Sequence, residues 1–71
     1  MKEKLESLIE ALDEAYYEAK SYFNNACEFV EKNPTESNFN SKSKSFDIYE
    51  KVIKARQTIR AVYNKHYNNG L

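Results

Sequence analysis

Few side chains in this chain could do chemistry, and they do not form a recognisable set. Cys27 is the single cysteine and His66 the single histidine, so neither an internal disulfide nor a Cys/His metal cluster is expected. A reactive thiolate needs a cationic neighbour, whereas Asn24 and Glu31 are the helical neighbours of Cys27 on one side. The sequence also lacks a Glu-x-x-His pair, a glycine-rich phosphate loop and a Ser/His/Asp set. We therefore expect no catalytic residue, no metal and no cofactor.

One spacing invites comparison with an enzyme family. The segment RAVYNKH places Arg60 six residues before His66, near the end of a predicted helix. This pattern resembles the Arg-x(4–6)-His motif of HEPN ribonucleases, which are dimeric helical proteins. The resemblance implies that Arg60 and His66 would orient a 2′-hydroxyl and stabilise the developing charge on a phosphate. Those domains have more helices than the two expected here, so we interpret Arg60 as a solvent-facing base and His66 as an interface residue.

The charges of the chain are divided between its two halves. Residues 1–36 carry nine acidic side chains and four lysines, and residues 37–71 carry seven basic side chains and two acidic ones. Such halves are expected to face each other as an antiparallel pair. The alternative is that Arg56 and Arg60, interleaved with Tyr49 and Tyr63, bind nucleic acid through phosphate contacts and base stacking. A net charge of zero argues against that alternative.

Apolar residues follow a helical period through the first half of the chain. Three neighbouring heptad positions stay apolar over four heptads, namely Leu5, Leu12, Ala19 and Ala26, then Leu8, Ala15, Tyr22 and Phe29, then Ile9, Tyr16, Phe23 and Val30. So wide a stripe predicts one helix over Lys2–Lys32, packed along its whole length. Polar residues, Asp13 and Glu14 among them, occupy the other face, where we expect them to be solvated.

A tight turn at residues 33–34 is predicted to separate this helix from a second one. In Asn33-Pro34-Thr35-Glu36, an asparagine N-cap precedes a proline at the first helical position. The second helix is then expected over about residues 34–68, with Gly70 beyond its end.

The start of this second helix is the open part of the prediction. A constant seven-residue phase of apolar residues continues back to Phe39, which favours a continuous helix. Serine and asparagine are weak helix formers, however, so residues 35–43 could fray. The alternative is a loop to about Lys42, with Ser43 or Ser45 as the N-cap.

The predicted fold is all-α, with residues 1–71 forming a single antiparallel two-helix hairpin of coiled-coil type. Two helices cannot cover stripes three positions wide, so we expect the hairpin to dimerise into a four-helix bundle, or to form a higher homo-oligomer. The residues predicted to mediate self-association are Leu8, Ile9, Leu12, Tyr16, Phe23, Val52, Ile53 and Ile59.

These features favour a small non-catalytic protein–protein interaction module of the adaptor, regulator or inhibitor type. Its expected partners are itself and another protein, contacted through Tyr17, Arg56 and Arg60. Tyr17 stands out because it is an aromatic residue on an acidic arc, and tyrosine is enriched at binding surfaces. No membrane-spanning or signal segment is recognisable, and a lone cysteine fits a reducing compartment, so a cytoplasmic location is expected.

Overall fold

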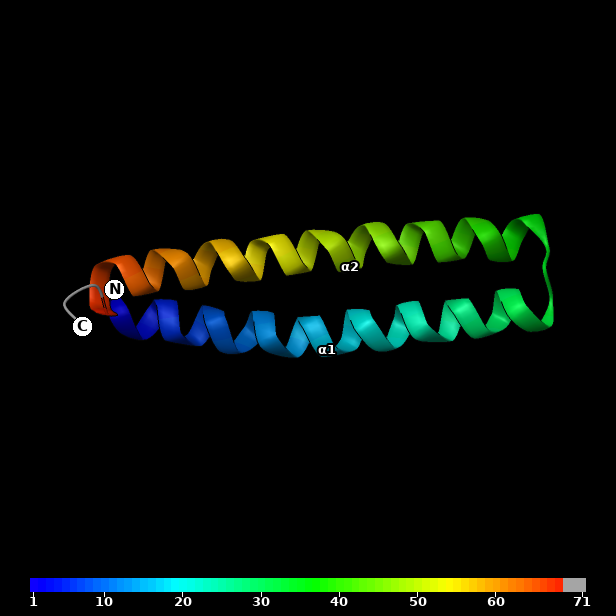
Figure 1. The fold of residues 1–71 in the computed structure, drawn as a ribbon. Helices are drawn as coiled ribbons and strands as arrows, with labels where there is room; N and C mark the ends of the chain where they lie inside the picture. Colours follow the sequence, from blue (N-terminus) through cyan, green and yellow to red (C-terminus); the bar gives the residue numbers. More distant parts are fainter. Residues whose placement is uncertain (69–71) are drawn as a thin grey trace.

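The computed structural model describes residues 1–68 as two long antiparallel helices joined by a short turn (Figure 1). Helix α1 spans Lys2–Lys32, helix α2 spans Glu36–Tyr63, and a π-helical turn, η1, covers Asn64–Asn68. The predicted all-α hairpin is therefore confirmed, and α1 has the predicted bounds. The second helix is α-helical over a shorter range than predicted, and Gly70, predicted to follow its end, lies outside the described residues.

The turn differs from its prediction in one residue role. Asn33 is not the N-cap of α2, because its backbone N–H still donates to Phe29 O at 2.8 Å and makes it the C-cap of α1. A residue before proline is disfavoured in the α conformation, and Asn33 has φ −139° and ψ 84°. Thr35 is the N-cap instead, with its Oγ1 accepting from the backbone N–H of Asn38 at 3.2 Å.

Asn38 also ties the two helices together across the turn. Its Nδ2 donates to the backbone oxygen of Asn33 at 2.8 Å and to that of Phe29 at 3.5 Å. Each of these carbonyls also accepts from a backbone N–H, that of Phe29 from Asn33 and that of Asn33 from Thr35, both at 2.8 Å. The side chain of the third residue of α2 therefore adds a second donor at the end of α1, where carbonyls have few intrahelical partners, and links the two helices at the point where the chain reverses.

The Ser/Asn-rich stretch is helical throughout, so the alternative of a loop to about Lys42 is wrong. Ser45 is accommodated because its hydroxyl bonds locally and its small size suits the contact between the helices. Its Oγ donates to Lys42 O at 2.8 Å, and the residue is 0% exposed. Ala19 and Ala26, each 8% exposed, are the other buried residues within 1–68. Small residues therefore line the closest contact.

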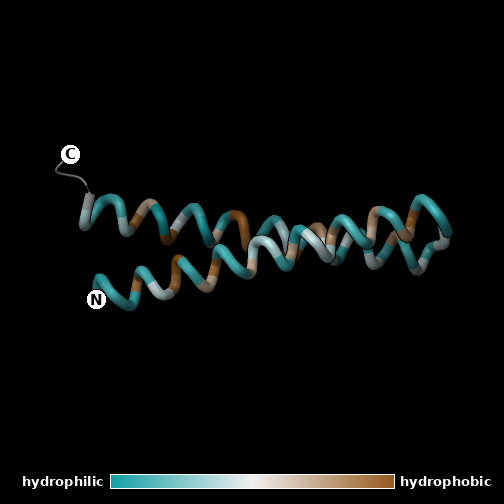
Figure 2. The backbone as a smooth tube through the Cα atoms, turned by 90° about the horizontal axis from the view of Figure 1, so that it is seen from below, coloured by the Kyte–Doolittle hydropathy of each residue, from teal (hydrophilic) through white to brown (hydrophobic). Residues whose placement is uncertain are grey.

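The hairpin is long and has a thin core. Its principal extents are 51 × 17 × 15 Å, and its radius of gyration is 16.0 Å against about 11 Å for a compact domain of this length. Hydrophobic segments recur along both helices, which cross when seen from below (Figure 2). Within residues 1–68, neither helix combines the length and apolar character that crossing a membrane requires.

Candidate functional site

The hairpin has two long faces, one on each side of the plane that contains both helices. They differ in which heptad positions they display. We call the first the bridged face, because polar side chains join the helices across it; its residues are Asp13, Tyr16, Phe23, Phe46, Tyr49, Ile53, Arg56, Arg60 and Tyr63. We call the second the open face; its residues are Leu8, Ala15, Tyr22, Phe29, Ile48, Ala55 and Val62.

An ion cluster around Asp13 dominates the bridged face. Arg56 Nε donates to Asp13 Oδ1 at 2.6 Å, and Arg60 Nη2 donates to both carboxylate oxygens at 3.0 and 2.8 Å. The hydrogen bond from Arg56, followed by that from Arg60, holds the pKa of Asp13 below its ordinary value. The same bond to Asp13 raises the pKa of Arg56. One carboxylate of α1 therefore binds two arginines that lie one turn apart on α2.

Aromatic rings continue the bridged face toward the turn. The guanidinium carbon of Arg56 lies 4.7 Å from the ring centroid of Tyr16, a cation–π distance. The Tyr49 hydroxyl donates to the Tyr16 hydroxyl at 3.4 Å, which lowers the pKa of Tyr16 and raises that of Tyr49. The ring of Phe23 lies between those of Tyr49 and Phe46, at centroid distances of 5.8 and 5.4 Å. Rings at these distances interlock the two helices.

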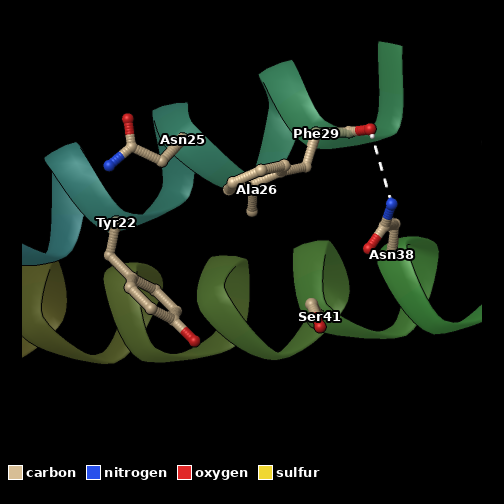
Figure 3. Close-up of a pocket in the computed structure, with 6 residues that line it drawn as sticks. All are labelled: Tyr22, Asn25, Ala26, Phe29, Asn38 and Ser41. Atoms are coloured by element: carbon tan, nitrogen blue, oxygen red, sulfur yellow. Dashed lines mark hydrogen bonds between the residues drawn. The ribbon is translucent and has the colours of Figure 1, made fainter. Parts of the chain in front are cut away.

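The open face carries large apolar side chains with little cover. Tyr22 is 58% exposed, Phe29 61% and Ile48 53%. A hollow of about 380 Å³ lies beside the turn, lined by Tyr22, Asn25, Ala26 and Phe29 of α1 and by Asn38 and Ser41 of α2. The Tyr22 ring extends toward α2, whereas the Phe29 ring lies along α1 beside Ala26 (Figure 3). A second hollow of about 420 Å³ follows on the other side of Tyr22, lined by Ala15, Glu18, Ala19, Tyr22, Ile48 and Val52. In the described residues, no ion pair joins the helices across this face.

The residues predicted for self-association fall into three places. Leu8 lies on the open face and is exposed. Leu12, Val52 and Ile59 lie on the midline between the helices, and Ile9, Tyr16, Phe23 and Ile53 lie toward the bridged face; all seven are half-buried within the hairpin. Most of the residues predicted for self-association therefore pack within one hairpin. The prediction does not include the exposed apolar side chains of the open face, such as Tyr22 and Ile48.

The three residues predicted to contact a partner differ in whether their side chains are free to do so. Tyr17 is 65% exposed, and its ring meets that of Tyr16 edge-on. Arg56 and Arg60 are instead bound to Asp13, so the prediction that Asp13 is a solvated residue of the polar arc is wrong. A signal for this cluster exists in the sequence, because Asp13 pairs in the antiparallel register with basic residues one turn apart.

Arg60 and His66 contact different neighbours and do not form a site together. The Arg60 guanidinium binds both oxygens of Asp13, whereas His66 lies in η1 with its ring 6.3 Å from that of Tyr67. Within residues 1–68, no group of three or more His, Cys, Asp and Glu side chains could hold a metal ion. The Cys27 thiol is free and half-buried.

No protein-family model matches the chain, and neither a curated protein nor a solved structure matches it. The two faces of the hairpin are therefore the features from which a function can be inferred.

Proposed function

We propose that this chain is a small non-catalytic protein–protein interaction module that self-associates and then binds another protein. The observation that carries the proposal is the amount of surface left uncovered. The hairpin exposes 5609 Å², whereas a compact protein of 8.4 kDa exposes roughly 4,600 Å². The excess of about 1,000 Å² is close to the ~800 Å² that each partner buries in a standard protein interface.

The side chains on the exposed surface also favour self-association, because several of them are large and apolar. The exposed large hydrophobic residues include Leu8, Tyr22, Phe29, Ile48 and Val62. Removing apolar surface from water contributes about 25 cal/mol per Å², so covering several of these side chains offsets the entropy that association costs. A continuous apolar strip of this kind marks an interaction site in a soluble protein.

The partner contact is proposed at Tyr17. This ring lies beside the bridged face and away from the strip that self-association would cover, so it stays accessible in an oligomer. Glu14, which lies one helical turn from Tyr17, would favour a partner with basic groups. An adaptor, regulator or inhibitor in the cytoplasm fits these features, and the free Cys27 thiol is compatible with a reducing compartment.

The alternative of nucleic-acid binding receives less support. It requires Arg56 and Arg60 to reach phosphates, yet both guanidiniums are engaged with Asp13. Breaking that cluster would cost part of the energy gained from a phosphate. We therefore do not retain this alternative.

Sedimentation equilibrium from micromolar to near-millimolar protein, with far-UV circular dichroism on the same samples, tests the proposal. The expected result is a helical dimer or higher oligomer whose fraction grows with concentration. A folded monomer over the whole range would overturn self-association. The exposed strip would then be free for a different protein.

A further inference from the structure

We infer that a second copy of this chain covers the open face, with the twofold axis parallel to the helices, so that α1 of each copy packs against α2 of the other. This inference rests on the proposed self-association and specifies its geometry. The cost of desolvation selects the face, and the charges of the two helices select the axis and the second copy as occupant.

The cost of removing water distinguishes the faces. A second copy on the bridged face would desolvate Asp13, Arg56 and Arg60, as well as the Tyr63 hydroxyl that donates to Glu6 Oε2 at 3.4 Å. Charged groups lose hydration energy on burial even when they are paired. The open face has no such pair between the helices in the described part of the chain. Its two hollows are lined by apolar and small polar side chains, apart from Glu18 at the edge of one of them, so a second copy there removes less water from charged groups.

The choice of axis follows from charge. Helix α1 carries eight acidic side chains and four lysines, whereas α2 carries six basic side chains and three acidic ones. A twofold axis parallel to the helices places each α1 beside the α2 of the second copy. An axis across the helices would place α1 beside α1 and α2 beside α2, where like charges repel. The parallel axis is therefore favoured.

The parallel axis also fixes the register, because a twofold rotation about it causes no shift along the helices. Residues at one level in the hairpin then lie at one level between copies. Asp13 with Arg56, and Phe23 with Phe46, define these levels within a copy. By the same register Glu18, which lines the hollow beside Tyr22, meets Lys51 of the second copy. This pair would flank the apolar strip.

Side-chain size is consistent with this register. Tyr22 would approach Ile48 of the second copy, and Leu8 would approach Val62 of that copy. Phe29 would lie over Ser41 of the second copy, where the hollow beside the turn offers room for the ring. Large side chains placed over small ones let four helices pack in layers.

The choice of face is tested with two matched lysine substitutions. Ile48→Lys alters the open face and Phe46→Lys the bridged face; the two residues are 53% and 45% exposed and lie on the same helix. Ile48→Lys is expected to raise the dimer dissociation constant about 100-fold or more in sedimentation equilibrium, because each copy buries an unpaired charge. Phe46→Lys loses the ring contact with Phe23, so far-UV circular dichroism is used to choose a temperature at which this variant is as helical as wild type. Under those conditions it is expected to leave the dissociation constant within about threefold. The reverse outcome would overturn the choice of face.

The choice of axis is tested with a spin label near the turn of the full-length chain. Cys27→Ser removes the native thiol, and Glu36→Cys places one label at the start of α2. With helices about 8–10 Å apart, the parallel axis predicts a label separation below roughly 30 Å in double electron–electron resonance. An axis across a hairpin 51 Å long predicts about 45 Å and would overturn the inference.

These outcomes separate the inference from the proposed function. A wild-type chain that stays monomeric removes the self-association on which the inference rests. A wild-type dimer with the long label separation, or with the face preference reversed, leaves the proposed function standing and removes only this geometry. The label measurement does not depend on the folding of the Ile48→Lys variant.

Discussion

The two faces of the hairpin differ in how their side chains are satisfied. On the bridged face, Asp13 is 31% exposed and binds Arg56 and Arg60, and aromatic rings interlock beside it. On the open face, Tyr22 and Ile48 line one hollow and remain 58% and 53% exposed. The difference indicates that one face holds the hairpin together while the other remains available for association. Each of the following substitutions tests that division.

The largest effect is expected on the midline that both faces share. Ser45 is fully buried at the contact between the helices, so Ser45→Leu would force them apart. We expect a loss of about 3 kcal/mol in the free energy of unfolding, enough to unfold much of a small domain. Ser45→Ala is the control and should change stability by less than about 1 kcal/mol, because it removes one local hydrogen bond. Urea unfolding followed by circular dichroism measures the free energy of unfolding of both variants. If both lost the same amount, side-chain size would not be what limits the residue at position 45.

A smaller effect should separate the faces directly. Phe23→Ala removes a half-buried ring that packs against Phe46 and Tyr49, so the free energy of unfolding should fall by about 2 kcal/mol. Tyr22→Ala on the open face is the matched substitution and should mainly weaken association. Thermal melts at the lowest usable concentration, where monomer dominates, distinguish the two. If Tyr22→Ala destabilised the monomer as much as Phe23→Ala, the division between faces would be lost.

The Asp13 cluster makes the stability of the bridged face depend on pH. The two arginine hydrogen bonds lower the pKa of Asp13 in the folded chain from 3.8, so the unfolded chain binds more protons at low pH. The stabilisation is present above about pH 4 and is lost as the pH falls toward the lowered folded pKa. Asp13→Asn should therefore lower the melting temperature by about 5 °C at pH 7 and by less at pH 3.

The control for Asp13 is its exposed neighbour Glu14. Glu14→Gln removes one negative charge from α1 and leaves the ion pairs of Asp13 and Glu50 intact, so its melting temperature should match wild type at pH 7 within about 1 °C. Melting curves at pH 3, 4, 5 and 7 for both variants measure the difference. A pH profile of Asp13→Asn that parallels wild type would show that the cluster contributes nothing to folding.

Much of the fold was predictable, because local signals agree along most of the chain. The stripe through Leu5, Leu12 and Ala19 fixes α1, and the continuous phase from Phe39 favours the helix over the loop. The N-cap was misassigned because Asn33 and Thr35 both have capping side chains. Only the three-dimensional turn reveals that Asn33 still ends α1.

The site was less predictable, because a heptad pattern gives the apolar stripe but not which part of it a partner helix covers. Most of the predicted self-association residues, Tyr16 and Phe23 among them, are used within the hairpin, and Tyr22 and Ile48 are left outside. The sequence predicts that Asp13 is solvated, because its heptad position flanks the apolar stripe. Arg56 and Arg60 of α2 nevertheless bind it, and whether their long side chains can do so depends on the register between the helices.

The smallest effect concerns the charges at the edge of the open face. Glu18→Lys or Lys51→Glu alone should raise the dimer dissociation constant by about threefold, since exposed ion pairs contribute little each. The double variant restores opposite charges and should return the constant to near the wild-type value. Sedimentation equilibrium at low salt measures the series, and the differences should shrink at about 1 M salt because charges are then screened.

Lys54→Glu is the control for this series. Lys54 lies one turn from Lys51 on the outer side of α2 and pairs with Glu50 at 3.2 Å within its own helix. Its reversal changes the net charge as Lys51→Glu does, but away from the second copy, so the dissociation constant should stay near wild type. The double variant can recover the wild-type dissociation constant only if Glu18 of one copy lies next to Lys51 of the other. A double variant no tighter than the weaker single one would show that the two charges are not neighbours across copies and would contradict the parallel axis.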